Sequence, residues 1–302
     1  MKIKLYFHIY IFIYDINMNY REVSIKDPLY GYIEIDNEML KIINTPPFQR
    51  LRGLKQLGFC SYVYPTAEHS RFSHSIGTGH LARRAMKTLQ SNQPELNITD
   101  REIFLVTVAG SCHDLGHGPN SHAFETCLHK MGIDFKHEQM SVELLKVIIN
   151  DYNIQISDTE IEMITHMILG KIYDANRSFM YSIVNDVNAS IDVDKMDYLY
   201  RDGLFTGKNN PPYYEQLLNN CRVINGKLCY DEKEDRTIYE LFYTRYRMYD
   251  EVYLHKTVKA IEFMFLDIMN HLSKCFNISE YINDARKYIT LTDNFIQYLP
   301  II

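Results

Sequence analysis

The stretch SCHDLGHGPNSH, residues 111–122, concentrates side chains that could bind a metal ion. His113 and Asp114 are adjacent, and His117 follows one helical turn after His113. Adjacent residues of a helix point about 100° apart, so both can reach one ion only near a helix end. A histidine and a carboxylate at the end of a buried helix are costly unless a partner such as a divalent metal satisfies them. For any single histidine a helix cap or a solvated side chain is the simpler interpretation, but it does not suit the group.

Three other stretches could bring polar side chains to the same place: HSRFSHSIG, HEQMS and IDVDKMDYLYRD. The first offers His74 at the start of a helix, with Arg71 just before it. The second begins a helix with His137. The third carries polar residues at three-to-four-residue spacing on one face of an otherwise apolar helix: Asp194, Tyr198 and Arg201 or Asp202.

The apolar spacing predicts a mostly α fold for the segments that carry these residues. The segment from Thr99 begins with a capping box that includes Glu102, and it continues as a buried, nearly all-apolar helix that the sequence GHGP should end. Two short β-hairpins are predicted, in DPLYGYIEID and in CRVINGKLCYD, where Asn225-Gly226 is a strong two-residue turn. Further helices are predicted at about 121–132, 137–150, 158–169, 178–203 and 236–275.

The chain has no internal repeat or long linker, so we predict one helical domain over residues 20–275. Residues 1–19 are interpreted as an unstructured or mis-assigned extension, with Met18 as a candidate start and a signal peptide as the less favoured alternative. Residues 276–302 are expected to form a tail that could begin a truncated C-terminal lobe.

The composition is that of an ordinary globular protein, with 302 residues, 46% of them hydrophobic, and a net charge of −6. This charge argues against a protein that coats nucleic acid, so nucleic-acid binding is possible but not indicated. Six cysteines without CxxC spacing favour free thiols in a reducing compartment, and hence an intracellular location, cytoplasmic or nuclear. No run approaches the roughly 18 apolar residues that span a bilayer, so no membrane partner is expected.

Six motifs carry a resemblance to a known family: FQRLRGLKQLG, RFSHSIGTGHLA, CHDLGHGPNSHAFE, HEQMSVELL, IDVDKMDYLYRD and YTRYRMYDEVYLHKTV. A lone histidine, a His-Asp doublet and a distant aspartate form the pattern of the HD-domain metal-dependent phosphohydrolases. The ordered set resembles the deoxynucleoside triphosphate triphosphohydrolases, in particular the branch that combines a sterile-alpha motif with the HD domain in vertebrates. The resemblance extends from about Asp27 to Leu266 and implies an HD-domain helical bundle with short β-hairpins.

The resemblance also implies roles for individual residues. It implies one divalent metal ion (Fe, Mn, Zn or Mg) bound by His74, His113, Asp114 and Asp194. The implied triphosphate-binding cations are Arg71, Lys195 and Arg245. The residues implied to hold or flank the nucleoside are Gln56, Leu57, Tyr198, Asp202 and Tyr253. Those implied to move protons, orient water or assist with the phosphates are His122, Glu125, His117 and His137.

The activity that the resemblance implies is hydrolysis of deoxynucleoside triphosphates, dGTP among them, to a deoxynucleoside and inorganic triphosphate. A homo-oligomer, dimer or higher, is the implied assembly. Two alternatives remain open at this point: another HD phosphohydrolase, such as a nucleotidase or phosphodiesterase, and a catalytically silent binding module. The intact set of polar residues argues against the silent module, because unpaired buried polar groups are costly to keep.

Departures from the family pattern predict weak or absent activation by guanine nucleotide. Asn44 stands where the vertebrate relative has an aspartate, although Gln49 and Arg52 are retained. Asparagine offers a single acceptor oxygen to a guanine edge. Tyr249, in place of a histidine near the substrate, is a separate departure that bears on nucleotide preference. For activation, Val23 also replaces an expected basic residue. Hydrolysis of dNTPs by the purified protein should therefore change little when GTP is added, and a many-fold rise in rate would contradict this expectation.

Overall fold

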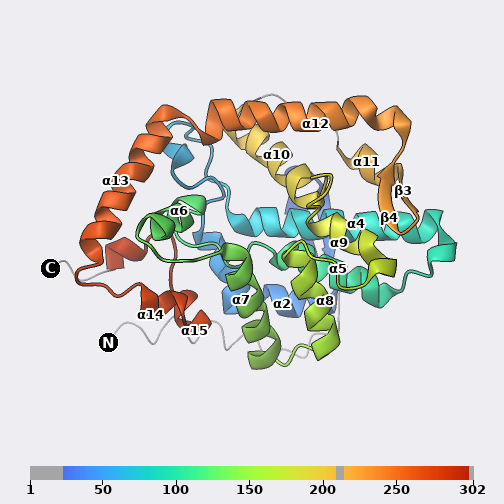
Figure 1. The fold of residues 1–302 in the computed structure, drawn as a ribbon, viewed down its shortest axis with the longest axis horizontal. Coiled ribbons are helices and arrows are strands. Elements are labelled where there is room, and N and C mark those ends of the chain that lie inside the picture. The colour runs from blue at the N-terminus through green and yellow to red at the C-terminus, as the bar shows by residue number, and fades with distance from the viewer. Residues whose placement is uncertain (1–22, 209–213, 299–302) are drawn as a thin grey trace.

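The computed structural model describes residues 23–208 and 214–298, which form a mostly helical bundle (Figure 1). Two helices pack along each other at its centre, α4 (Arg71–Asn92) and α5 (Asp100–Cys112). The helix α10 (Val193–Thr206) packs against α4. The predicted mostly α class with short hairpins is confirmed. Three helices that meet here therefore carry the four predicted metal ligands at or next to their ends.

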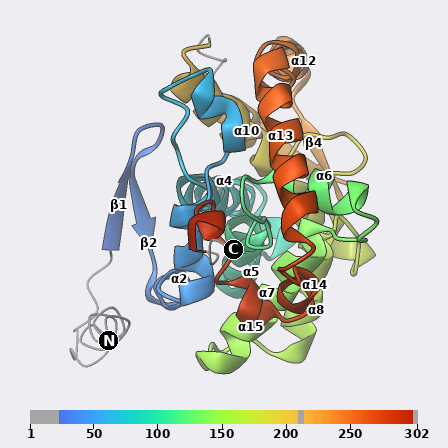
Figure 2. The same ribbon diagram turned by 90° about the vertical axis from the view of Figure 1, so that its left-hand side faces the viewer.

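Both predicted β-hairpins are present as two-stranded antiparallel sheets. The first pairs β1 (Val23–Asp27) with β2 (Gly31–Ile35), so it begins four residues earlier than its sequence signal. Figure 2 shows this hairpin on the side of the bundle away from α13. The second pairs β3 (Cys221–Ile224) with β4 (Lys227–Tyr230), and the predicted turn residues Asn225 and Gly226 both have positive φ.

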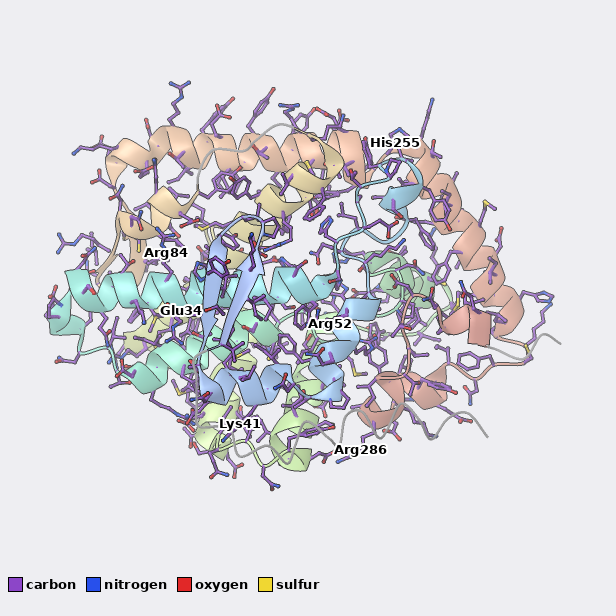
Figure 3. The ribbon with its side chains drawn as sticks, turned by 180° about the vertical axis from the view of Figure 1, so that it is seen from behind. Glu34, Lys41, Arg52, Arg84, His255 and Arg286 are labelled. Carbon is purple, nitrogen blue, oxygen red and sulfur yellow. The ribbon has the colours of Figure 1, made fainter. Side chains whose placement is uncertain are left out.

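The segment between the first hairpin and α4 contains short helices. As expected, the Pro46-Pro47 pair follows the end of one helix and begins the next. The short helices are α2 (Asn37–Ile43), α3 (Pro46–Gln49) and the 3-10 turns η1 (Arg50–Gly53) and η2 (Gly58–Tyr62). Figure 3 shows Arg52 on the back of the molecule, beside the start of α4. Its Nε donates to Gln49 Oε1 at 2.8 Å, so these two retained residues bind each other.

Three predicted helices follow residues 113–121, the histidine-rich loop, in the chain. They are α6 (His122–Lys130), α7 (His137–Asp151) and α8 (Asp158–Ile168). The capping box of Thr99 and Glu102 begins α5, also as predicted. However, α5 ends at Cys112, before the GHGP sequence that was expected to end it. His113 is therefore the C-cap, and Asp114 lies in the turn beyond it.

The single helix predicted over residues 178–203 is wrong. The structure has α9 (Ser178–Val184) and α10, separated by residues 185–192. Asp192 caps α10 by accepting from the amide of Lys195, and Asp186 accepts from two amides in the connecting turn. These aspartates offer the backbone an alternative to helix, which a hydrophobic pattern does not register.

The single helix predicted over residues 236–275 is wrong for a related reason. It divides into α12 (Asp235–Met248), a π-helical turn (Tyr249–Tyr253) and α13 (Lys256–Leu272). His255 accepts from the amide of Thr257 and begins α13. Figure 1 shows α12 and α13 along two edges of the molecule, meeting at a corner. The π-helical turn lies at this corner and carries Tyr253.

Residues 276–298, which were expected to form a tail, pack against the bundle. They include α14 (Ser279–Ile282) and α15 (Ala285–Tyr288), and the latter contacts α7. Leu291 and Phe295 are buried. The interpretation of residues 1–19 as an extension concerns residues outside the described ranges. Within those ranges, no helix combines the length and apolarity that crossing a bilayer demands.

Candidate active site

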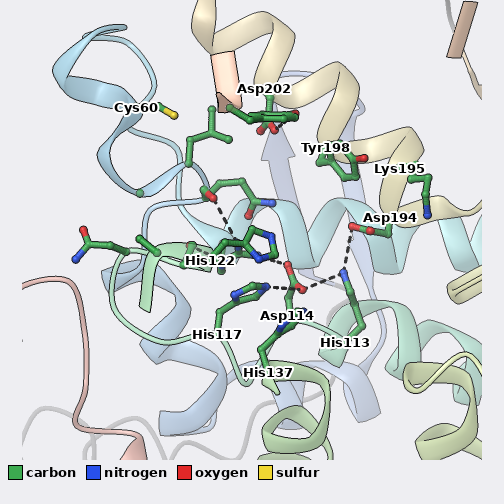
Figure 4. A pocket seen from close by; sticks show the side chains of 18 of the residues that line it. Cys60, His113, Asp114, His117, His122, His137, Asp194, Lys195, Tyr198 and Asp202 are labelled. Carbon is green, nitrogen blue, oxygen red and sulfur yellow. Dashed lines mark hydrogen bonds and ion pairs between the residues drawn. The ribbon is translucent and has the colours of Figure 1, made fainter. Parts of the chain in front are cut away.

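The four predicted metal ligands converge on one point. Figure 4 shows three of them, His113, Asp114 and Asp194. His74 Nε2 lies 3.1 Å from Asp194 Oδ1 and 3.4 Å from Asp114 Oδ2. His113 Nε2 lies 3.3 Å from Asp194 Oδ1 and 3.4 Å from Asp114 Oδ1. Residues from α4, from the end of α5 and from the first turn of α10 therefore form a closed ring of nitrogen and oxygen atoms.

The hydrogen bonds of the two histidines test whether this ring fits a metal ion. His74 Nδ1 lies 2.8 Å from Asp197 Oδ2, and His113 Nδ1 lies 2.7 Å from the carbonyl oxygen of Gly110. Because both partners accept, both imidazoles are assigned N–H at Nδ1, which leaves Nε2 as the atom that can take a proton or bind a metal ion. His74 Nε2 is buried and has no hydrogen-bond partner in the described part of the chain.

Nitrogen lone pairs that face carboxylate oxygens repel them unless a proton or a metal cation lies between them. Ligand atoms about 2.1 Å from one ion lie about 3.0–3.4 Å apart at angles between 90° and 110°. The four observed separations, 3.1–3.4 Å, fall in this range. Burial opposes positive charge on His74, yet its carboxylate contacts raise its pKa well above the usual value. The site formed by His74, His113, Asp114 and Asp194 therefore favours positive charge, and its residues fit a divalent metal ion.

A buried ion pair holds His74 in place. Asp197 Oδ2, which accepts from His74, also accepts from Arg201 Nε at 2.8 Å, and Asp197 Oδ1 accepts from Tyr30 Oη at 2.9 Å. Burial opposes ionisation of Asp197, but the Arg201 charge and the hydrogen bonds from His74 and Arg201 together outweigh it, and the pKa of Asp197 falls to about 2. A β-carbon on Gly77 would lie 2.0 Å from Asp197 Oδ1, so the close packing requires glycine.

Sequence reasoning did not identify Asp197. It grouped Arg201 or Asp202 with Asp194, whereas the structure separates them: Arg201 is fully buried against Asp197 and Asp27, and Asp202 faces the pocket. The available signal was the four-residue spacing of Asp197 and Arg201 on one helix, which is that of an ion pair.

A cavity of about 450 Å³ adjoins the ring. All of the predicted site residues line this cavity except two, Glu125 and His74. The predicted residues that line it are Gln56, Leu57, Arg71, His113, Asp114, His117, His122, His137, Asp194, Lys195, Tyr198, Asp202, Arg245 and Tyr253. The structure thus brings together side chains from segments more than 190 residues apart.

The histidines predicted to act on protons form one cluster beside the ring. The His117 and His137 rings stack with centroids 3.9 Å apart, and the His122 ring is nearly perpendicular to both. His117 Nε2 lies 3.3 Å from Asp114 Oδ1, which joins the cluster to the metal ligands. Glu125 lies 2.6 Å from His137 Nδ1, so it contacts that ring rather than His122.

The His122 side chain is exposed toward the cavity, although protein atoms crowd the rest of the imidazole. This crowding, together with the positive charge of Arg71, lowers its pKa to about 4. The imidazole is therefore neutral at pH 7. A nearby negative charge would oppose each of these causes, so an anion bound beside Arg71 should raise the pKa of His122.

The predicted phosphate-binding cations are partly engaged within the protein. Arg71 is fully buried and donates to Asp114 Oδ2, to Ser121 Oγ at 2.7 Å and to the carbonyl oxygen of Gln56 at 3.3 Å. A guanidinium carries five N–H donors, so Arg71 keeps donors for an anion. Lys195 Nζ lies 2.6 Å from Asp192 Oδ2. Arg245 Nε is buried without a hydrogen-bond partner among the described residues.

The opposite end of the cavity carries hydroxyl-binding groups. Asp202 accepts from Tyr253 Oη at 2.7 Å and lies 2.8 Å from His69 Nε2. His69 was not identified from the sequence. Gln56 Oε1 is buried and has no hydrogen-bond partner within the described residues. Tyr249, the departure from the family pattern, is 44% exposed and packs edge-on against Tyr253 at the cavity wall.

Residues 71–202, which include all four predicted metal ligands, match the family model of the HD domain. The chain is 42% identical over 276 residues to "Deoxynucleoside triphosphate triphosphohydrolase SAMHD1 homolog" of Dictyostelium discoideum, covering 90% of this chain and 54% of that protein. It is 36% identical to human "Deoxynucleoside triphosphate triphosphohydrolase SAMHD1", covering 91% and 50%. A putative HD domain-containing protein of Acanthamoeba polyphaga mimivirus is 35% identical, covering 89% and 62%.

The chain thus contains an HD domain, and its resemblance to the deoxynucleoside triphosphate triphosphohydrolases is confirmed. It spans about half the length of the curated relatives named SAMHD1.

Replacing Asp197 by asparagine should weaken metal binding about 10–100-fold, because the partner that orients His74 loses its charge. The change also leaves the buried Arg201 charge without its main partner, which should cost about 3–5 kcal/mol of folding stability. Metal affinity is measured by competition with a chelator, and stability by thermal unfolding.

Asp192→Asn is the matched control, since it removes a buried carboxylate from the start of the same helix. The hydrogen bonds of Asp192 go to Lys195 and to the amide of Asp186 rather than to a metal ligand. Equal loss of metal affinity in both variants would contradict the role of Asp197.

The His122 imidazole should titrate near pH 4 in the free protein and at higher pH when an anion occupies the cavity. A ligand that raises a pKa binds the protonated form more tightly, so tripolyphosphate should bind more strongly as pH falls toward 4. Histidine NMR resonances, assigned with His122→Gln, measure both titrations. A free-protein pKa near 6.5 would show that neither the surrounding protein nor the Arg71 charge acts on His122.

Proposed function

We propose that this chain is a metal-dependent hydrolase that converts deoxynucleoside triphosphates, dGTP among them, into deoxynucleosides and inorganic triphosphate, and so limits the dNTP pool. The observation that carries the proposal is the position of the metal-ligand ring at one end of a cavity whose other end offers hydroxyl acceptors. The printed names of the Dictyostelium and human relatives support the same reaction.

The cavity would orient the substrate by charge at one end and by hydroxyl recognition at the other. The triphosphate would lie against Arg71, Lys195 and Arg245, where guanidinium groups can donate in pairs to phosphate oxygens. The 3′-hydroxyl would reach Gln56 Oε1, which has no other hydrogen-bond partner among the described residues, and Asp202. This arrangement would place the α-phosphorus beside the metal-ligand ring.

Selection of deoxyribose would depend on Leu57 and Tyr198. Both line the cavity and would lie beside the 2′ carbon. Leu57 offers no polar atom, so an added 2′-hydroxyl would have to be fitted into the space without gaining a hydrogen bond there. Ribonucleotides should therefore be poorer substrates.

The proposed reaction cleaves the bond between the α-phosphorus and the nucleoside O5′. A divalent metal held by His74, His113, Asp114 and Asp194 would supply Lewis acidity, which lowers the pKa of water and offsets phosphate charge. The attacking water contributes its oxygen to triphosphate, and O5′ leaves with a proton. His122 would carry that proton, because the charge of the bound triphosphate raises its pKa, and His137 with Glu125 would hold the histidine cluster in place.

We further propose that the chain forms homo-oligomers. The outer face of α12 carries aromatic side chains that are largely exposed, and Tyr239 and Tyr243 stack on each other there. Contiguous exposed apolar patches of this kind are typical of protein interfaces. The four exposed aromatic residues along α12 are Tyr239, Phe242, Tyr243 and Tyr246.

We also propose a reducing, intracellular location. All six cysteines are free, and four of them are buried. Buried thiols without disulfide partners are the usual state in a reducing compartment. Whether this compartment is cytoplasmic or nuclear depends on signals other than these thiols.

The decisive experiment is incubation with each dNTP and rNTP in the presence of Mn²⁺ or Mg²⁺, with chromatography of the products. We expect inorganic triphosphate and a deoxynucleoside in equal amounts, and a rate at least about 10³-fold lower in His113→Ala and Asp114→Ala. His166→Ala, on the outer part of α8, is the control and should keep full activity. Monophosphate or pyrophosphate as product would indicate a different HD phosphohydrolase, and no turnover of any nucleotide would indicate a binding module.

A further inference from the structure

Asp293, in the turn after α15, bonds two loops that meet at the cavity. Its Oδ2 accepts from the amide of Lys55 at 2.8 Å, and its Oδ1 accepts from the amide of Asn120 at 2.7 Å. Gln56 follows Lys55 directly and lines the cavity. His122 lies two residues after Asn120. One carboxylate therefore connects the loop proposed to bind sugar with the loop proposed to move the proton.

The loop before His122 has a conformation that needs outside support. Asn120 and Ser121 both have φ of 59°, which is in the left-handed region that residues with a β-carbon seldom adopt. Such conformations persist when the surrounding structure holds them. The Asn120 amide is held by Asp293, and Ser121 Oγ donates to the carbonyl oxygen of Lys55 at 2.6 Å.

The two loops also approach closely enough to exclude other arrangements. Gly58 has φ of 50°, and a β-carbon there would lie 2.7 Å from the carbonyl oxygen of Asn120. Arg71 spans the same junction, with bonds to Ser121 Oγ and to the carbonyl oxygen of Gln56. Asp293 thus joins the Lys55 loop to the Asn120 loop on the side away from the cavity, and Arg71 joins the same two loops on the cavity side.

The segment that carries Asp293 is itself anchored to the metal-binding loop. We call residues 288–293 the C-terminal strap. Tyr288 Oη donates to the carbonyl oxygen of Gly116 at 2.8 Å. Arg50 donates to the carbonyl oxygens of Leu291 and His117, both at 2.8 Å. The strap thus reaches the turn that follows the His-Asp doublet, as well as both cavity loops.

We propose that Asp293 is a positioning residue for catalysis: it fixes the separation between the loop that bears Gln56 and the loop that bears His122. This inference rests on the proposed function, because it assigns those loops to sugar binding and proton transfer. A carboxylate suits the task, since its two oxygens accept from both amides at once. Asparagine in its place has one acceptor oxygen and would turn an NH₂ group toward the second amide.

The test compares Asp293→Asn with the wild-type protein. We expect kcat/KM for dNTP hydrolysis to fall about tenfold to a hundredfold, because small displacements of reacting groups are costly in rate. The amides of Lys55 and Asn120 should exchange with solvent faster, as measured by NMR or by mass spectrometry of the peptides that contain them. Bound metal per chain should stay unchanged, because Asp293 bonds to the loops and not to the ligand ring.

Asp284→Ala is the control, because asparagine would still accept at the single oxygen, Oδ1, that receives both bonds. Asp284 also accepts from two backbone amides, but those of Arg286 and Lys287 in its own segment. It should destabilise α15 while leaving kcat/KM and the exchange of the Lys55 and Asn120 amides as in the wild type. An equal fall in kcat/KM in both variants would overturn the inference, because it would show a general effect of loosening the strap.

The exchange measurement separates this inference from the proposed function. If the wild-type protein hydrolyses no dNTP, the proposed function fails, and exchange alone decides whether Asp293 joins the loops. Wild-type exchange rates at Lys55 and Asn120 in Asp293→Asn would overturn the inference whatever the activity. Faster exchange with unchanged kcat/KM in an active enzyme would also overturn it.

Discussion

The convergence of two imidazoles and two carboxylates at the predicted metal site is the constraint on which the rest of the structure depends. Two imidazole nitrogens face the carboxylate oxygens at 3.1–3.4 Å, an arrangement that a buried site holds only with compensating positive charge. Each ligand is therefore held from behind: His74 by Asp197, and His113 by the carbonyl oxygen of Gly110. The packing of α4 against α5 and α10 brings these two supporting groups, Asp197 and Gly110, to the same place.

Much of this site could be predicted from the sequence because its chemistry is carried by residue type and local order. His113 and Asp114 are adjacent, and the motifs of His74 and Asp194 have a spacing that helices can bring together. The breaks at residues 185–192 and at the π-helical turn could not be predicted in this way. Side-chain caps such as Asp192 decide them, and apolar periodicity carries no information on such bonds.

The residues that support the site from outside the cavity were harder to predict, for a different reason. Asp197 and Asp293 act through contacts with residues far away in the chain, His74 in one case and Lys55 in the other. Nothing in the local sequence around Asp293 distinguishes it from a helix cap such as Asp284. A long-range hydrogen bond depends on the packing of the whole chain, so it becomes visible only when the packing is known.

Asp114 connects the proposed metal site to the proposed phosphate site, and this connection has a thermodynamic consequence. It faces both ring histidines and also binds Arg71 and His117. A metal cation bound among the four ligand atoms would attract the negative charge of Asp114. The hydrogen bond from Arg71 to Asp114 would then weaken, and more guanidinium donors would be available to phosphate. An anion on Arg71 would in turn leave more of the Asp114 charge to the cation. Linkage requires the two effects to be equal, so metal and triphosphate should each strengthen the binding of the other by the same factor.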